Sequence, residues 1–434
     1  MTLSKNPVFN LRATLQETGI AADTLRAWER RYGLPMPQRT PGGHRLYSQY
    51  DVEVIKWLQA RLEEGLSISR AVDMWNEHTA AGIDLLASVI PSTQTLPAVY
   101  LGAETTLDAL RQRWIESCMA FNEPAAEQTL NQAFAVFPAE AVCADLLQKG
   151  MSEIGGLWYR NKASVQQEHF ASALAMRRLE ALMSAAPAPT RSETVMVGCP
   201  AGEWHTFVAL MMAFFLRRRG LKVIYLGANV PHDQFQDAVQ SAHANLVILV
   251  AQTLTTAAAL SAAARALSDS STLVGFGGRI FNLHPDLQAR IHGVYLGGSI
   301  PSALEKAERL LRGKHKPAAP TLVPPEYSIA LQSFKSKRTH IEGSLKESLP
   351  FVSEGFNAGI QFLGDNILAA LQLGDMNYVS LEMDWTKSLL LAYSRPPEEL
   401  AYFMRSYSDA VEKHINGQGS PIKTWLKSQA EQIA

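Results

Sequence analysis

Between residues 188 and 316, short apolar runs alternate with segments of helical spacing. The runs are Val195–Cys199, Val223–Leu226, Leu246–Val250, Leu273–Phe276 and Val294–Leu296, and the helical segments lie near 205–219, 232–242, 256–268, 284–291 and 300–312. Five strand–helix units predict an α/β domain with a doubly wound parallel sheet of flavodoxin-like (Rossmann-like) order. Such sheets bind ligands outside the carboxyl ends of their strands, so the loops there are candidate sites.

The regions on either side of this domain follow helical spacing. From 106 to 187 apolar residues recur mostly at every third or fourth position, which predicts a four-helix bundle. A proline-rich stretch over 313–325 predicts an extended linker, and residues 328–434 predict a helical C-terminal domain. Its apolar content is Leu363, Ile367, Leu368, Leu371 and the run 389–393. Its role stays open between oligomerisation and sensing.

Residues 1–79 predict an all-α winged helix-turn-helix domain. Thr14–Glu17 is a capping box that opens a short helix ended by Gly19, and a second helix follows over 24–31. A basic hairpin over 39–47 turns at a Gly–Gly pair, and a third helix opens at Ser48. Two short helices about a tight turn, with a hairpin beside them, are typical of DNA-binding modules.

The charge balance of this module favours DNA binding only as a local patch. Residues 1–70 hold ten Lys and Arg against seven Asp and Glu, while the whole chain carries a formal net charge of −1. The alternative is a solvated charged helix. The segments Thr24–Leu34 and Arg39–Tyr47 resemble the MerR family over residues 9–70. The resemblance implies that two copies bind a double-stranded DNA operator through Arg12, Thr24, Arg26, Arg30, Tyr32, Arg39, His44, Arg45 and Tyr47.

The first strand–helix loop of the α/β domain contains the sequence Glu203–Trp204–His205. A histidine that binds a metal normally donates its other ring N–H to a carboxylate, which fixes its tautomer. Two residues apart in an extended loop, Glu203 and His205 can point the same way and form such a pair. The alternative interpretation is a helix N-cap acid beside an exposed histidine.

Two further loops are predicted at the same edge of the sheet. Residues 251–255 follow the third strand, and Gly277–Gly278 follows the fourth, where glycines allow a bulky ligand to approach the backbone. The alternative is that the two glycines only form a turn. Together the loops resemble the cobalamin-binding domain. The resemblance implies that His205 binds cobalt and that Glu203, Val208, Thr253, Leu254, Gly277 and Gly278 surround the cofactor.

The helical bundle contributes a third motif, Trp158 followed after nine residues by Glu168–His169. A capping box at Ser164–Gln167 places this acid and imidazole in the first turns of a helix. The alternative is a core tryptophan and two surface residues. The motif and the domain order over 9–316 resemble the CarH/LitR group of MerR-type B12 photoreceptors. The resemblance implies a light-responsive regulator with adenosylcobalamin between bundle and sheet.

Three positions depart from the family pattern. Val208 replaces a glycine, Ala251 replaces a loop serine, and Tyr159 stands where some members have a second histidine. These departures support a second hypothesis, a regulator that has lost cobalamin and responds to another ligand or to a protein partner. A third hypothesis, a corrinoid mutase or methyltransferase, would require a catalytic barrel that this sequence does not predict, so we expect no enzyme.

Composition sets the remaining expectations. With 47% hydrophobic and 19% charged residues, the chain is typical of a globular protein. The three cysteines, Cys118, Cys143 and Cys199, are widely spaced, which favours free thiols in a reducing cytoplasm. The first residues lack an apolar signal core, and no apolar run approaches a membrane span of about 20 residues. We therefore expect a cytoplasmic homo-oligomer, either dimer or tetramer, without membrane contact.

Overall fold

The computed structural model describes residues 4–40, 43–63, 66–80, 86, 106–160, 162–313, 319–348, 354–380 and 397–433. They fall into two compact units, Met1–Glu104 and Thr105–Ala434, which we describe separately. Within the described ranges, no helix combines the length and apolar character needed to cross a bilayer.

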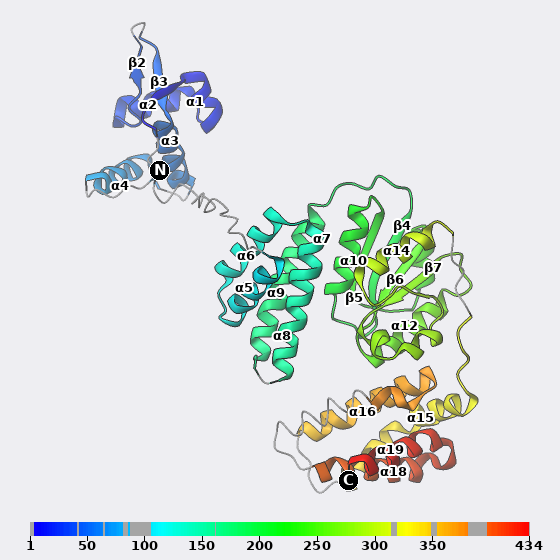
Figure 1. Cartoon of the computed structure of the whole chain (residues 1–434). Helices are drawn as coiled ribbons and strands as arrows, with labels where there is room; N and C mark the ends of the chain where they lie inside the picture. The colour runs from blue at the N-terminus through cyan, green and yellow to red at the C-terminus, as the bar shows by residue number, and fades with distance from the viewer. Residues whose placement is uncertain are drawn as a thin grey trace. The chain divides into compact units, whose positions relative to one another are not determined.

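The N-terminal unit combines short helices with a small antiparallel sheet of order β1-β3-β2 (Figure 1). Its elements are β1 (Pro7–Asn10), α1 (Leu11–Thr18), α2 (Ala22–Tyr32), β2 (Gln38–Arg39), β3 (Arg45–Ser48), α3 (Gln49–Glu63) and α4 (Ile68–Ala80). The expectation of an all-α domain is therefore wrong. Strand β3 pairs with β2 on one side and, on the other, with β1, which precedes the first helix.

The first helix of this unit begins earlier than the capping-box pattern predicted. Asn10 is the N-cap of α1, because its side chain accepts from the Ala13 amide at 2.9 Å. Thr14 is buried within the helix and donates its hydroxyl to the Asn10 carbonyl. The predicted stop is confirmed, since Gly19 adopts a left-handed conformation and closes α1. Gly42 of the expected turn lies outside the described residues.

The second unit begins with helices that pack around Trp114 and its buried neighbours. They are α5 (Leu107–Met119), α6 (Glu123–Val136), α7 (Ala139–Ala141), the π-helical turn η1 (Val142–Gln148), α8 (Lys149–Tyr159) and α9 (Val165–Ser184). The capping box at Ser164 is confirmed, with Ser164 and Gln167 bonded reciprocally. Helix α9 packs against α10, the first helix of the α/β domain.

The α/β domain has a parallel five-stranded sheet of order β5-β4-β6-β7-β8. In chain order this is the flavodoxin-like arrangement 2-1-3-4-5 that the sequence predicted. The strands are β4 (Thr194–Pro200), β5 (Lys222–Val230), β6 (Leu246–Val250), β7 (Leu273–Gly277) and β8 (Val294–Tyr295). The helices are α10 (Phe207–Arg218), α11 (Phe235–Ser241), α12 (Leu254–Ala266), α13 (Arg279–Leu283) and α14 (Ile300–Leu311), and η2 (Pro285–Arg290) is a 3-10 helix.

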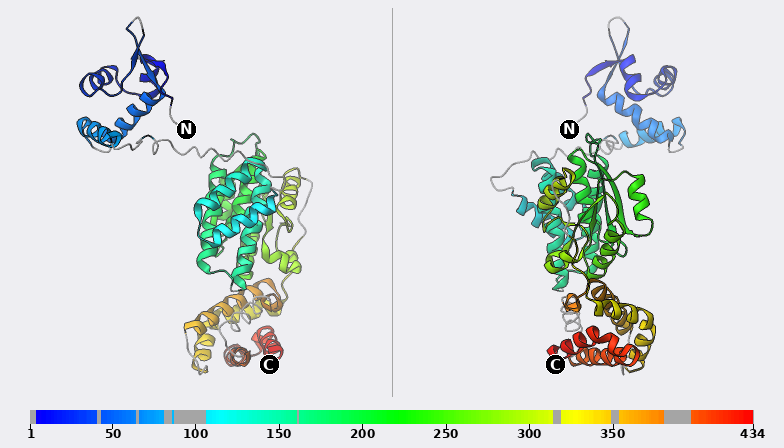
Figure 2. Two further views of the ribbon diagram at one scale, coloured as in Figure 1. Left: turned by 60° about the vertical axis from the view of Figure 1, so that its left-hand side comes forward. Right: turned by 90° about the vertical axis from the view of Figure 1, so that its right-hand side faces the viewer.

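Two hydrophobic cores lie on opposite faces of this sheet. One joins α10 and α14 to the N-terminal helices of the unit, and the other joins α11, α12 and α13 to the C-terminal helices. Figure 2 shows these layers from two further sides. The three predicted loops lie at the carboxyl ends of β4, β6 and β7.

The described C-terminal residues are mostly helical, as predicted. They form α15 (Pro325–Ser348), α16 (Glu354–Leu373), η3 (Met376–Val379), α18 (Pro397–Ile415), η4 (Asn416–Gly419) and α19 (Ser420–Ile433). The predicted apolar run 389–393 lies outside the described residues. Because α16 packs against α12, these helices share a core with the sheet instead of standing apart (Figure 1).

Candidate functional site

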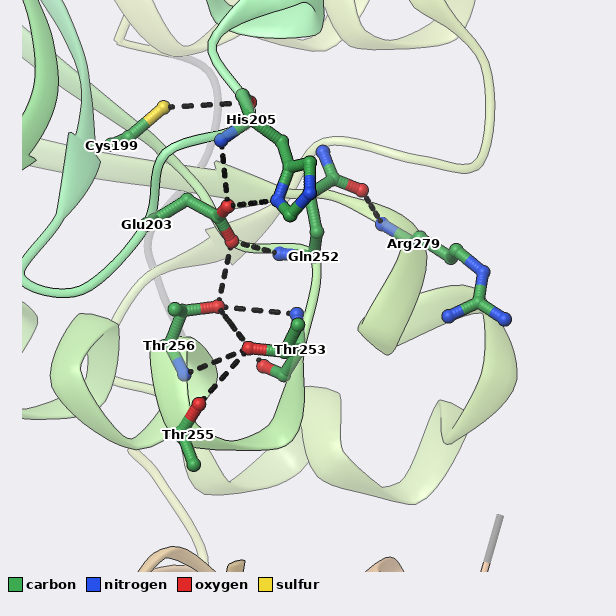
Figure 3. Close-up of polar contacts among 8 residues, drawn as sticks. All are labelled: Cys199, Glu203, His205, Gln252, Thr253, Thr255, Thr256 and Arg279. Atoms are coloured by element: carbon green, nitrogen blue, oxygen red, sulfur yellow. Dashed lines mark hydrogen bonds and ion pairs between the residues drawn. The ribbon is translucent and has the colours of Figure 1, made fainter. Parts of the chain in front are cut away.

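The loop after β4 pairs a buried carboxylate with an exposed imidazole. Glu203 is 1% exposed, whereas the side chain of His205 is 74% exposed. Nδ1 of His205 lies 2.7 Å from Oε1 of Glu203, and the His205 amide donates to the same oxygen at 3.0 Å (Figure 3). Because a carboxylate only accepts, the neutral imidazole carries its proton on Nδ1 and keeps the lone pair on Nε2.

The second oxygen of Glu203 ties this loop to the loop after β6. Oε2 accepts from the Gln252 amide at 2.7 Å and from the Thr256 hydroxyl at 2.8 Å. Burial alone would raise the pKa of Glu203, but these bonds and those from His205 outweigh burial and lower it. The carboxylate is therefore held in its charged form, which fixes the imidazole in one orientation.

The pKa of His205 is raised above its ordinary value of 6.5. The hydrogen bond with Glu203 is the largest cause, and it outweighs the partial desolvation of the ring, which lowers the pKa. The carboxylate of Glu168 also contributes, although it lies on α9 of the preceding helices. That Glu168 and His205 border one ligand site remains a prediction.

Sequence reasoning missed Asn229, which positions the Glu203 loop from the end of β5. Its side chain accepts from the Gly202 amide at 2.8 Å, and its own amide donates to the Glu203 carbonyl at 3.0 Å. Asn229 has φ +53°, a left-handed conformation that asparagine tolerates better than most residues. The sequence Gly-Ala-Asn after a strand run was the available signal.

The two glycines of the third loop have different roles. A Cβ on Gly278, at φ +120°, would lie 1.9 Å from the Ala251 carbonyl oxygen, so this glycine is needed for packing between loops. A Cβ on Gly277 would meet nothing within 4 Å, so the space beside it is open. The Arg279 amide donates to the Gln252 side chain at 3.1 Å, which joins this loop to the network in Figure 3. The expected close approach of a ligand therefore remains a prediction for Gly277 alone.

The remaining loop positions lie partly below the surface. Thr253 caps α12 and accepts from the Thr256 amide at 3.3 Å. Leu254 is fully buried in the core beneath the loop, so it supports the loop from inside and is not available to a ligand. Val208 is half-buried against the core that includes α10, and Ala251 is fully buried.

Glu168 and His169 of the bundle motif form a second polar cluster, on α9. Trp158 is 37% exposed in the last turn of α8. Oε2 of Glu168 lies 2.9 Å from Nδ1 of the exposed His169, and Oε1 accepts from the Ser172 hydroxyl at 3.2 Å. Trp204, between Glu203 and His205, is 68% exposed, and sequence reasoning gave it no role.

In the N-terminal unit, Glu29 of α2 joins the hairpin to the helix. It accepts from Nε of Arg45 at 2.6 Å and from the hydroxyl of Tyr47 at 2.5 Å. The hydrogen bond and charge of Glu29 outweigh desolvation and raise the pKa of Arg45. Tyr47 is fully buried, so its assignment as a DNA contact is wrong, because the side chain belongs to the core.

The other predicted DNA-binding residues lie at the surface of this unit. Arg26 is bonded to Asp23 at 3.3 Å in the same helix, Tyr32 is half-buried, and Arg45 keeps part of its side chain exposed. The exposed members are Arg12, Thr24, Arg26, Arg30, Arg39 and His44. They come from α1, α2 and the hairpin, and each is a polar or cationic donor suited to phosphate or base edges.

Comparisons with known proteins agree with both halves of this description. Residues 9–77 match the MerR HTH family regulatory proteins, and residues 110–183 and 193–307 match two B12 binding domain families. The chain is 30% identical over 238 residues to the HTH-type transcriptional repressor CarH of Myxococcus xanthus, covering 53% of this chain and 74% of CarH. It is 33% identical over 243 residues to CarA of the same organism, covering 55% of this chain and 75% of CarA.

The chain belongs to the family of MerR-type regulators with B12-binding domains. Its first part is also 43% identical over 61 residues to the HTH-type transcriptional regulator MlrA of Escherichia coli, covering 13% of this chain and 25% of MlrA. Among solved structures, a Methanosarcina barkeri monomethylamine corrinoid protein aligns with 46% of this chain and 98% of its own, at 15% identity and a TM-score of 0.42.

Proposed function

We propose that this regulator binds a double-stranded DNA operator and is controlled by a cobalamin bound between the bundle helices and the carboxyl edge of the sheet. The observation that carries the proposal is the exposed His205 imidazole, held through Nδ1 by a buried carboxylate. A carboxylate–histidine pair of this kind orients a metal ligand and increases its basicity. The B12 binding domain matches supply the class of cofactor.

The residues at this edge fit a cobalamin. A single exposed imidazole suits a metal that brings its other ligands with it, as the cobalt of a corrin ring does. Gly277 leaves open space beside the loop. When bound, a cobalamin would supply a cobalt ion that can accept the His205 imidazole and, in its adenosyl form, a light-sensitive cobalt–carbon bond.

In this proposal each part of the site has its own task. His205 binds cobalt, and Glu203, Thr256 and Asn229 hold its loop in place. Thr253, Val208 and Gly277 border the same face, while Leu254 and Gly278 support the loops from within. The bundle residues Trp158, Glu168 and His169 cover the opposite face of the cofactor.

The proposal extends to adenosylcobalamin, to light and to assembly. The motif Trp158, Glu168 and His169 supports an adenosyl group as the upper ligand, and its loss in light would change the contacts of the bundle. A ligand changes assembly only if it interacts differently with two assembly states, here those of a homo-oligomer.

The test is a visible-absorption titration of the purified chain with adenosylcobalamin, in the dark and after illumination, combined with size-exclusion chromatography. We expect a spectrum of histidine-ligated cobalamin, its loss in His205→Ala, and a light-dependent change in elution volume. His205→Ala should remain folded because its ring is mostly exposed. Identical spectra for the parent and His205→Ala proteins would reject His205 as the cobalt ligand.

A second candidate function is a regulator that has lost cobalamin and responds to another ligand or a protein partner. It is favoured by the branched side chain of Val208 against the core and by the missing hydroxyl at Ala251. If the parent protein binds no corrinoid but Val208→Gly does, this candidate is correct. A parent protein that binds cobalamin rejects it.

A further inference from the structure

The C-terminal helices pack on the helix that begins inside the His205 network. Helix α12 starts at the Thr253 cap, and Thr256 in its first turn donates to Glu203. Two residues further on, the Ala258 carbonyl accepts from the Gln372 side chain of α16 at 2.8 Å. Buried residues of α12 and α16 share one hydrophobic core. Helix α12 thus contacts both the candidate cofactor loop and the C-terminal helix α16.

A second connection follows the glycine loop. The chain after Gly278 forms α13 and η2, and the ring of His284 between them packs edge-on against Tyr378 of η3, with centroids 5.3 Å apart. The Thr321 amide donates to the Ala289 carbonyl at 2.8 Å, and Arg290 donates to the Leu322 carbonyl at 2.7 Å. Two of the three loops at the carboxyl edge therefore lead directly into surfaces that hold the C-terminal helices.

These contacts connect Glu203 to the C-terminal helices through α12. Oε2 of Glu203 accepts from both Gln252 and Thr256, so a shift of the carboxylate pulls on the start of α12. Closely packed interiors transmit such shifts because they have few voids to absorb them. The helix can relay the shift to α16 through Ala258 and the shared core.

We propose that the C-terminal helices α15, α16, η3, α18 and α19 are energetically coupled to the His205 site through α12. A change at Glu203 alters the stability of α16 and η3, and the C-terminal helices in return set how tightly the site binds a corrinoid. Coupling between two sites is reciprocal by thermodynamic necessity. Only the second half of this proposal rests on the proposed function.

The first half is tested without any ligand, by hydrogen exchange of the full chain carrying Thr256→Val. This substitution keeps the shape of the side chain and removes the hydroxyl that donates to Glu203 and accepts from the Thr253 amide in the capping box of α12. Losing a hydrogen bond to a charged group should speed amide exchange in the first turns of α12 about tenfold. We expect exchange in α16 and η3 to rise about threefold as well.

Two matched variants make this result decisive. Thr255→Val removes a hydroxyl from the same turn that bonds only Thr253, so exchange in α16 should stay unchanged. Thr256→Ser retains the hydroxyl and should restore the parent exchange rates. Faster exchange in α12 with no change in α16 and η3 would overturn the coupling.

The second half is tested by titrating full-length Gln372→Ala with hydroxocobalamin, followed by visible absorption. We expect its dissociation constant to change about fivefold, the lower end of typical allosteric coupling. Gln361→Ala, an exposed position on the same helix, is the control and should match the parent. Equal affinity of the parent and Gln372→Ala rejects the reciprocal half. If the parent binds no hydroxocobalamin, the proposed function and this half both fail, and the exchange experiment decides the first half alone.

Discussion

Two glutamates, the buried Glu203 and the partly buried Glu29, organise two regions of this protein with opposite results. Glu203 holds Nδ1 of His205 and leaves that side chain 74% exposed. Glu29, whose side chain is 10% exposed, binds Arg45 and Tyr47, and leaves Arg45 27% and Tyr47 0% exposed. In both regions a carboxylate accepts the hydrogen bonds, but His205 stays exposed to solvent and Tyr47 is buried.

The difference follows from the polar atoms that each side chain has besides the one bonded to glutamate. Imidazole has a second nitrogen on the far side of the ring, so a bond at Nδ1 leaves Nε2 available. Tyrosine has one polar atom, and in Tyr47 that hydroxyl is bonded to Glu29. Arg45 lies between these cases, because the bond at Nε leaves its terminal nitrogens for another contact.

Of the variants that test this comparison, Glu203→Gln should have the largest effect, a loss of corrinoid affinity. The amide keeps the shape of the side chain but loses the charge that orients His205, and such losses typically cost 10- to 100-fold in metal affinity, an order-of-magnitude range. We expect a weakening of about that size in a spectral titration with hydroxocobalamin. Glu193→Gln, at the start of β4 and paired with Arg191, should leave affinity unchanged. Equal affinities for the Glu203 variant and the parent would show that the carboxylate does not orient the ligand.

The pH dependence of cobalamin binding should also reveal the pairing of Glu203 with His205. Protonated imidazole cannot bind a metal, and Glu203 raises the pKa of His205 above 6.5. Histidine-ligated cobalamin binding should therefore be complete above that raised pKa and weaken about tenfold per pH unit below it. In Glu203→Gln the midpoint should move to lower pH, because the cause of the raised pKa is gone. A midpoint that does not move would contradict this assignment.

In the N-terminal unit, Arg30→Ala should weaken operator binding without changing the absorption spectrum of bound cobalamin. The side chain is exposed on α2, and losing one phosphate contact should lower the slope of log affinity against log salt by about one unit. Gel-shift titrations at several salt concentrations measure that slope. Arg70→Ala on α4 is the control and should keep the parent slope. An unchanged slope for Arg30→Ala would remove Arg30 from the DNA contacts.

The smallest effect on DNA binding should come from Tyr47→Phe. It removes a buried hydroxyl bonded to Glu29, which should lower the free energy of unfolding of the N-terminal unit by about 1–2 kcal/mol. Hydrogen exchange in α2 and β3 measures this loss. The operator salt slope should not change, since the side chain is in the core. A reduced slope would return Tyr47 to the set of DNA contacts.

Local sequence patterns determined the elements of this fold. The strand Leu246–Val250 was predicted to the residue, and the Ser164 capping box and the Gly19 stop formed as expected. These features depend on periodicity and on contacts within a few residues, which a sequence shows directly. The pair Glu203 and His205 was predictable for the same reason, because its members are two residues apart.

Tertiary structure alone decided which residues are exposed and what lies beside them. Tyr47 and Leu254 sit in motifs that suggested surface roles, yet both are buried, because partners distant in the sequence pack against them. Asn229 of β5 contacts the Glu203 loop through Gly202. Gln372 of α16 contacts Ala258 of α12, which is more than 100 residues away in the sequence. Such contacts depend on loop closure and on packing between whole elements. The periodicity of apolar residues along the chain does not predict which helices and strands pack against one another.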